Sequence, residues 1–547
     1  MADDAEKHDS GVSTSPAADG ANPTVTRGKK PLRFYMAYLS LVLMVFIVSL
    51  DSTVLAVAIP VITRELHGTT LDGFWANLTF LLAVVVTQPL YVSASDVIGR
   101  KIMLNIAFFF FFIGSIVFAT APSMPAVIVG RLVQGLGGGG LDVLNEVLLC
   151  DITTMKERSL WLGLLSIPLA TGFIFGPVLG ALFTQYASWR YIGWINLPLV
   201  AVNFALAVYG LRLTPVKGSL FSRLRRLDWI GMLLFSIGSA TFALPLSWGG
   251  ALYPWSSFRT ILPLVIGLLA LVLFGIYEAR PTDPVIPYRI FSSVTAIATL
   301  LGGFIHGLVL YPLILYLPLF FQAVYLQDPL QAAVSILPQN VLVIAFTALS
   351  GFTIEYLRHY RWQLWLGWAA TTVGIGLFAL WGDDFSRAKT AGFEVIASVG
   401  LGVLFVVPAI AMQASAKVDD QGLAVGTLVT FRLFGGLIGI AAASAIFSNA
   451  FARSISSLGP LPDSVALLAD SANAIGFIPT LKVVDIPPEL RDAIRGSYND
   501  AMRTLWYFLA AASGVGFFAS FLIQNLSIES EEVGAQHIEH STPAVQD

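Results

Sequence analysis

Fourteen long runs of apolar residues, separated by short polar or charged segments, are the feature that most restricts how this chain folds. Each run supplies about the 20 residues that an α-helix needs to cross a bilayer. The apolar residues are continuous rather than alternating with polar ones, so helices are favoured over the strands of a membrane β-barrel. The chain is therefore predicted to be an all-α polytopic membrane protein. The predicted spans are 35–60, 75–93, 102–121, 124–149, 159–186, 191–212, 228–247, 260–279, 293–321, 329–354, 363–381, 390–413, 422–449 and 504–526.

The composition excludes several classes of protein. Hydrophobic residues make up 56% of the 547 residues and charged residues only 12%, whereas soluble proteins average about 25% charged. A soluble enzyme or a disordered scaffold cannot cover so much apolar surface with so few charges. The net charge of −3 gives no field that would attract a nucleic acid. The lipid bilayer is therefore the expected surrounding, and no nucleic-acid partner is expected.

Residues that hold metals or nucleotides are scarce. Cys150 is the only cysteine, and of the six histidines only His306 falls within an apolar run. This excludes an internal disulfide, a thiolate metal cluster and a histidine box. The sequence also lacks a Gly-x-x-x-x-Gly-Lys-[Ser/Thr] phosphate loop. We therefore expect no metal, no cofactor and no enzyme activity, and any pumping must draw on an ion gradient or on the gradient of the substrate.

The distribution of lysine and arginine predicts how the chain lies in the membrane. With the N-terminus in the cytosol, the short inner loops carry 14 of these residues and the short outer loops carry 5, as the positive-inside rule requires. Residues 1–34 and 527–547 are polar and are expected to be cytosolic tails, the first of them disordered. The long outer segment 450–503 is expected to cap the outer face, with a surface helix leading into the last span; a substrate gate is the alternative.

Five charged residues lie well within the predicted spans: Asp51, Arg131, Asp142, Glu146 and Arg432. Each would cost at least about 2.5 kcal/mol if it faced lipid, so each should face a partner or a water-filled cavity. Counting about 1.5 Å of rise per residue from the inner end of each span places Asp51 and Arg131 at similar depth. These two side chains are therefore predicted to pair across the first and fourth spans.

Asp142 and Glu146 lie four residues apart on one face of the fourth span, and Arg131 precedes them on the same stripe. Two carboxylates this close favour protonation of one of them, which suits a proton carrier. Ordinary titration of Glu146 at the inner interface remains the alternative. Arg432 is either a counter-charge for a substrate or a packed structural ion, and His306 is interpreted as a hydrogen-bonded core residue rather than a proton relay.

The fifth span carries the pattern Gly172-x-x-x-Gly176-Pro177-x-x-Gly180. Small residues at every fourth position let a neighbouring helix approach closely. Proline frees a backbone carbonyl and bends the helix. A bendable, closely packed helix suits a moving part of the molecule.

Taken together, these residues resemble the major facilitator superfamily, and within it the fungal-type 14-spanner drug:proton antiporters, over about residues 35–526. Residues 50–54 and 58–60 are similar to the first-helix signature of that family. A second resemblance is to the loop motif that latches the two halves of the family's fold, and it is carried by Asp96, Gly99, Arg100 and Lys101. Val92 and Val97 depart from that loop motif, which implies a looser or differently packed latch.

Two further motifs carry the resemblance. Arg131-x-x-Gln134-Gly135 resembles the fourth-helix motif linked to proton transfer. Gly172-x-x-x-Gly176-Pro177-x-x-Gly180 resembles the fifth-helix antiporter motif, which in this superfamily points to export. The departure here is Ala181, where the family has a second glycine.

The resemblance implies a major facilitator fold of two six-helix lobes plus two extra helices, 14 spans in all. The lobes would cover 35–212 and 293–526, with a linker at 213–292 that holds the extra pair. A substrate cavity would lie between the lobes, and proton entry would drive alternating access. Aromatic and polar residues that would line this cavity are Tyr311, Tyr316, Gln322 and Arg432, although core packing remains the alternative for each aromatic residue.

The predicted function is a proton-coupled exporter of hydrophobic or amphipathic small molecules such as toxins, secondary metabolites or drugs. Protons would enter from outside and neutralise Asp51 or the Asp142/Glu146 pair, with Arg131 in the same proton-coupling set. One alternative is a proton-coupled importer of a nutrient or metal chelate, which the proline–glycine pattern of the fifth span disfavours. Another is a membrane-embedded enzyme or a non-transporting sensor. The expected partners are a small-molecule substrate, protons and lipid. The protein is expected to act as a monomer in the plasma membrane, with the vacuolar membrane as the alternative.

Overall fold

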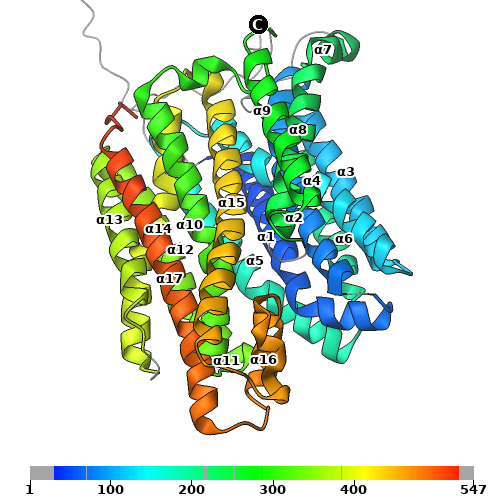
Figure 1. Cartoon of the computed structure of the whole chain (residues 1–547). Coiled ribbons are helices and arrows are strands. Elements are labelled where there is room, and N and C mark those ends of the chain that lie inside the picture. Colours follow the sequence, from blue (N-terminus) through cyan, green and yellow to red (C-terminus); the bar gives the residue numbers. More distant parts are fainter. Residues whose placement is uncertain are drawn as a thin grey trace, which may run out of the picture.

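A computed structural model describes residues 30–68, 70–213, 219–249, 253–281, 284–382 and 385–528 of the chain. The predicted tails, 1–34 and 527–547, lie almost entirely outside these residues. The described part is built from helices (Figure 1), which confirms the predicted fold class. Its helices of 18 residues or more are α1 (Leu32–Glu65), α2 (Thr70–Ile98), α3 (Arg100–Ala119), α4 (Met124–Ile152), α5 (Met155–Tyr186), α6 (Tyr191–Gly210), α8 (Trp229–Trp248), α9 (Phe258–Tyr277), α10 (Val294–Val324), α12 (Leu337–Leu357), α13 (Arg361–Phe378), α14 (Arg387–Ala414), α15 (Gln421–Ser456) and α17 (Pro488–Ser520).

Each predicted span overlaps one of these long helices. Within the described residues, 12 helices are long and apolar enough to cross a membrane. The helices α13 and α17 are long but do not meet that criterion, so the count of 14 spans stays a prediction. One span differs from its predicted extent: 329–354 is divided into the short α11 (Pro329–Ser335) and α12. Pro338, in the first turn of α12, cannot continue a preceding helix.

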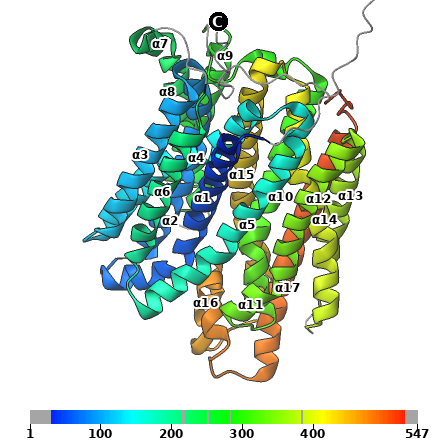
Figure 2. The ribbon, with the colours of Figure 1, turned by 180° about the vertical axis from the view of Figure 1, so that it is seen from behind.

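The long helices form two lobes that lie side by side (Figures 1 and 2). In the N-terminal lobe, α1 packs against α5 and α6, and α4 packs against α2 and α3. In the C-terminal lobe, α10 packs against α15 and α17, and α14 packs against α12 and α13. The lobes meet where α5 contacts α12 and where α2 and α4 contact α15. The extra pair, α8 and α9, packs on itself and rests on α2 and α15.

Close helix contacts in both lobes depend on glycine. A Cβ added to Gly435 would overlap the carbonyl oxygen of Phe304, and one added to Gly137 would overlap the backbone of Phe111. Without a hydrophobic drive between helices inside lipid, such close backbone packing is a main source of helix association. These contacts join α15 to α10 and α4 to α3.

The segment between α15 and α17 folds onto the C-terminal lobe. It contains the short helix α16 (Ala474–Leu481), seen at the lower end in Figure 1. The Tyr498 hydroxyl donates to the Ala474 carbonyl oxygen at 2.6 Å, and Lys482 pairs with Asp328 at 2.6 Å. The surface helix expected before the last span is the first half of α17, which runs without a break from Pro488 to Ser520.

Candidate functional site: a cavity between the lobes

A cavity of about 150 Å³ lies between the two lobes. The N-terminal lobe lines it with residues of α1, α2, α4 and α5, and the C-terminal lobe with residues of α10, α14 and α15. Most of the lining is apolar, with aromatic rings from Phe80, Phe173 and Phe405. Any movement of one lobe against the other must therefore reshape this cavity.

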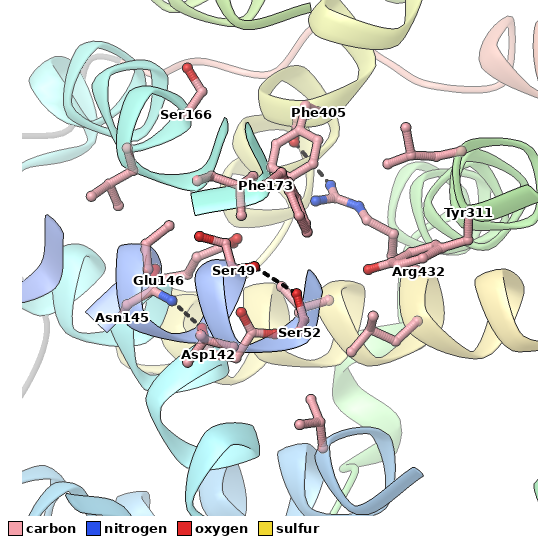
Figure 3. A pocket seen from close by; sticks show the side chains of 18 of the residues that line it. Ser49, Ser52, Asp142, Asn145, Glu146, Ser166, Phe173, Tyr311, Phe405 and Arg432 are labelled. Carbon is pink, nitrogen blue, oxygen red and sulfur yellow. Dashed lines mark hydrogen bonds between the residues drawn. The ribbon is translucent and has the colours of Figure 1, made fainter. Parts of the chain in front are cut away.

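The N-terminal lobe contributes two carboxyl groups to the cavity. Asp142 and Glu146 both line it, as their spacing on one face of α4 allows. The Gln88 amide donates to Asp142 Oδ2 at 2.6 Å, and the Asn145 amide donates to the backbone oxygen of Asp142. Figure 3 shows both carboxyl groups on the side of the cavity opposite Arg432 and Tyr311.

Arg432 is the cationic group of the C-terminal lobe at this cavity. Its guanidinium donates to the Phe405 carbonyl oxygen at 2.9 Å and lies 4.7 Å from the centre of the Phe405 ring. Arg432 Nε is buried without a hydrogen-bond partner. Asp142 and Glu146 are near enough to interact with Arg432 electrostatically, but within the described residues no ion pair joins them to it. The two carboxyl groups therefore face the guanidinium across the cavity without forming an ion pair with it.

Asp51 and Arg131 form a separate, closed cluster. Arg131 Nη1 pairs with Asp51 Oδ2 at 2.5 Å, and both side chains are only 1% exposed. Asp51 Oδ1 accepts from the amides of Gln134 at 2.9 Å and of Asn196 at 2.8 Å. The contact expected from their matching depth is present, and helices α1, α4 and α6 converge on it.

Helix α1 separates this cluster from the cavity. Ser49 and Ser52 of α1 line the cavity, while Asp51, between them, contacts α4 and α6. Phe80 also lies between the cavity and the cluster. Its ring lines the cavity and is 4.2 Å from the Arg131 guanidinium. The stripe shared by Arg131, Asp142 and Glu146 therefore does not bring Arg131 into the cavity.

Two of the four residues expected to line the cavity do so, and two do not. Tyr311 and Arg432 line it. Tyr316 is buried against Phe447, because five residues along a helix turn it about 140° away from Tyr311. Gln322 shares the Tyr311 face but lies about 16 Å further along α10, where its amide donates to the Pro318 carbonyl oxygen.

Three of the four predicted latch residues, Asp96, Gly99 and Arg100, lie together beside the C-terminal lobe. Arg100 pairs with Asp96 and with Asp151, the second at 3.0 Å. Gly99 adopts φ 114°, a conformation that side chains rarely tolerate. Arg100 also approaches the C-terminal lobe, because a Cβ on Gly422 would lie 3.1 Å from Arg100 Nη2. Lys101 is exposed and takes no part in this cluster.

Arg158 joins the lobes more directly, although its position in the sequence predicted only an inner-loop positive charge. Its Nη1 donates to the side-chain oxygens of Gln413 at 3.0 Å and Gln421 at 2.6 Å. Its Nη2 donates to the backbone oxygens of Cys150 and Thr153. Arg158 is thus a buried arginine of the N-terminal lobe that is held by glutamines of the C-terminal lobe.

The antiporter-type motif of α5 lies against α1. A Cβ on Gly172 would overlap Ser49 Oγ, one on Gly176 would overlap Thr53 Oγ1, and one on Gly180 would overlap the Val54 carbonyl oxygen. Pro177 lies inside α5 between the last two glycines. The close approach predicted for this motif is therefore with the helix that carries Asp51.

Two further buried titratable residues outside the cavity lining, His306 and Glu394, have no hydrogen-bond partner among the described residues. His306 was expected to be a hydrogen-bonded core residue, but both its ring nitrogens are buried without a partner and the ring lies against Phe405. Both carboxyl oxygens of Glu394 in α14 are also buried and without a partner. Glu394 was missed because it falls close to the edge of its predicted span, where a charged residue usually reaches water.

Two lobes of membrane-length helices around a cavity that both lobes line define a membrane transporter. The family model of the Major Facilitator Superfamily matches residues 41–440, and the chain belongs to this superfamily, whose members are transporters rather than enzymes. The MFS-type transporter sphD of Aspergillus fumigatus is 43% identical over 98% of this chain and 93% of its own length. The efflux pump FUS6 of Gibberella moniliformis is 32% identical over 93% of this chain and 91% of its own length.

The fold comparison agrees with the sequence comparison. The solved structure of the human organic anion transporter MFSD10 (TETRAN) matches with a TM-score of 0.59. The match covers 90% of this chain and 100% of that one at 14% identity. At this identity the likeness concerns the fold alone.

Proposed function

We propose that this transporter is a proton-coupled exporter of hydrophobic or amphipathic small molecules. The observation that carries the proposal is the arrangement of charges in the cavity: Asp142 and Glu146 of one lobe face Arg432 of the other, and no ion pair joins them in the described part of the chain. Unpaired carboxyl groups in a cavity at membrane depth are the groups that can exchange protons with water during transport.

Proton binding at these carboxyl groups changes the force between the lobes. When ionised, Asp142 and Glu146 attract Arg432 across a cavity of low dielectric and draw the two walls together. When Asp142 or Glu146 is protonated, its attraction to Arg432 falls, and the two lobes separate more easily at the cavity. A ligand shifts such an equilibrium only through its different affinity for the two states. Here the proton and the cargo both bind at the part of the cavity lined by Asp142 and Glu146.

The cavity lining indicates the class of cargo. Apolar side chains and the rings of Phe80, Phe173, Phe405 and Tyr311 favour an apolar or amphipathic molecule. A relative from Aspergillus aculeatus, named an Acurin A biosynthesis cluster MFS-type transporter, is 32% identical over 92% of this chain. That name, and the efflux pumps among the relatives, support export of a secondary metabolite or toxin. The proposal also places the transporter in the plasma membrane as a monomer, as expected from the sequence.

Asp51 serves the same cycle in a different way. Its carboxylate is saturated by Arg131, Gln134 and Asn196, so it holds α1 against α4 and α6. We assign it a positioning role in proton coupling, in which α1 carries movement of this cluster to Ser49 and Ser52 at the cavity wall.

The proposal is tested with purified protein in sealed vesicles that carry a pH difference. Transport of the amphipathic dye rhodamine 6G is followed together with the internal pH. We expect the dye to move against its gradient, to stop when a protonophore collapses the pH difference, and to be accompanied by proton movement in the opposite direction. Equal dye transport without a pH difference and without proton movement would refute coupling. Dye and protons moving in the same direction would indicate the importer.

A further inference from the structure

Two carboxyl groups outside the cavity lie at the ends of the extra helix pair. Asp228 caps the start of α8, where its Oδ1 accepts from the Gly231 backbone N–H at 2.8 Å. Glu278 follows the end of α9, and its Oε1 accepts from the Ile286 backbone N–H at 2.5 Å. Each carboxyl group thus uses one oxygen to hold the backbone. Neither residue lines the transport cavity.

The second oxygen of each carboxyl group is buried and unpartnered. Asp228 Oδ2 and Glu278 Oε2 have no hydrogen-bond partner, and the two residues are only 6% and 4% exposed. Both of these oxygens lie within 3.1 Å of the point where a Cβ on Gly231 would stand. The two free oxygens therefore approach the same small space, beside a residue that has no side chain to fill it.

The surroundings give these oxygens little compensation. The apolar cluster next to them contains Phe235, Phe274, Val285 and Ile286. The other titratable groups that act here are Tyr277, whose hydroxyl is near enough to Asp228 to hydrogen-bond with it, and the exposed Arg280, beside Tyr277. Burial raises the pKa of Glu278 to about 7, the backbone N–H groups of Ile286 and Val285 oppose that rise, and the charge of Asp228 adds to it.

Two apposed carboxylates in a buried site repel each other unless a proton or a cation lies between them. The site has few oxygens to offer a metal: within the described residues there is no group of three or more His, Cys, Asp or Glu side chains that could hold one. A proton needs only the two facing oxygens. We propose that Asp228 and Glu278 form a second proton-binding site, in which one proton is shared between Oδ2 of Asp228 and Oε2 of Glu278.

This site connects the extra helix pair to the chain that enters the C-terminal lobe. The segment 284–287 leads through Tyr288 towards α10, and Glu278 holds it through Ile286. With the proton bound, α8, α9 and this segment are joined around a neutral pair. When the proton leaves, repulsion between the carboxylates weakens the joint. The predicted orientation places this site on the cytosolic side, so the cytosolic pH would set how firmly the pair is attached.

The sign of the pH effect follows from linkage. Glu278 binds its proton more tightly in the folded protein than in the unfolded chain, where the carboxyl pKa is about 4.3. Its contribution to stability is therefore complete below about pH 4 and is lost as the pH rises through the folded pKa of about 7. The protein should become less heat-stable across that window as the solution becomes more alkaline.

The experiment measures the Tm of the purified full-length protein from about pH 5 to about pH 8. We expect the wild-type Tm to fall by several degrees over this range. Glu278→Gln, which resembles the protonated side chain, should remove a large part of the fall and should exceed the wild type in Tm at the alkaline end. Asp228→Asn keeps the helix cap and should lessen the fall. Asp463→Asn, an exposed carboxyl elsewhere, serves as the matched control and should follow the wild type.

A second measurement keeps the proposal testable if Glu278→Gln folds poorly. The infrared band of a protonated carboxyl group should lose intensity in Asp228→Asn and Glu278→Gln at pH values below 7, relative to the wild type. Parallel Tm curves for the wild type and Glu278→Gln would overturn the proposal. A rise in the alkaline Tm of the wild type on adding Ca²⁺ or Mg²⁺, absent in Glu278→Gln, would also overturn it and would indicate a cation site. These outcomes do not depend on transport of any cargo.

Discussion

The two charged clusters on either side of α1 differ in how fully their charges are satisfied. Asp51 has three side-chain donors, one of which is the arginine that pairs with it. Asp142, across the helix, has one side-chain donor in Gln88, and Arg432 faces it from the other lobe without an ion pair. The first cluster is contained within one lobe, and the second is divided between two.

This difference shows which charges can move during transport. Removing a partner from a saturated buried pair leaves an uncompensated charge, so the pair stays closed and fixes the helices around it. Charges separated by a cavity can gain or lose a proton or a ligand without breaking existing bonds. The Asp51 cluster therefore acts as a fixed support, and the cavity charges act as the responsive element.

The largest effect is expected at Arg131, and it tests whether the Asp51 cluster is a support. Arg131→Gln leaves Asp51 buried without its cation, which should cost about 3–5 kcal/mol of stability. Adding Asp51→Asn to Arg131→Gln removes the uncompensated charge and should restore part of that loss. The measurement is the Tm of the single and double variants in detergent. Wild-type stability of Arg131→Gln would show that the cluster is not a support.

A single substitution of Asp51 separates its two roles. Asp51→Asn keeps the size of the side chain, and although it leaves Arg131 without its anion, the protein should still reach the membrane. Dye efflux should nevertheless be abolished, because the charge that positions Arg131 is gone. Efflux at the wild-type rate would contradict the role assigned to this carboxylate.

The cavity carboxyl groups should show the opposite pattern. Asp142→Asn and Glu146→Gln break no ion pair. Their free energy of unfolding, followed through the Tm, should therefore stay within about 1 kcal/mol of the wild-type value. Proton-coupled dye transport should be lost, and any remaining flux should no longer respond to the pH difference. Ser166→Ala alters the same cavity without removing a charge and is the matched control. Coupled transport in both carboxyl variants would place the proton elsewhere, for example at Glu394.

Depth and helical periodicity explain what the sequence could predict. They were sufficient for the positions of the long helices, for the contact of Asp51 with Arg131, and for the shared face of Asp142 and Glu146. They were insufficient for Tyr316, because the face that a fully apolar helix turns to a cavity depends on its neighbours. The roles of Arg158 and Asp151 depend on which loops of different helices meet, and a single sequence does not contain that information.

The glycines of α5 offer a test of the helix between the two clusters, because they lie in close contact with α1. Gly172→Ala would drive a methyl group into Ser49 of α1, and overpacking of this kind costs about 1–3 kcal/mol. Gly275→Ala in α9 is the control, since nothing lies within 4 Å of its added Cβ. The Tm of Gly172→Ala should fall while that of Gly275→Ala holds. Equal Tm values would mean that α1 and α5 can move apart to accommodate the methyl group without a measurable loss of stability.

The smallest effect concerns the contact that keeps the lobes together beyond the cavity. Arg158→Gln removes the donors to Gln413 and Gln421 and frees the Cys150 carbonyl oxygen. Because one interlobe contact of this kind is worth about 1–2 kcal/mol, the population of molecules open at this end should rise several-fold. Cys150, the only cysteine and buried beside Arg158, reports the change as faster labelling by a maleimide. Arg225→Gln, on the exposed surface of α7 (Leu220–Arg226), is the control. If Cys150 reacts at the same rate in both variants, closure at this end does not depend on Arg158, and the cavity charges alone must hold the lobes.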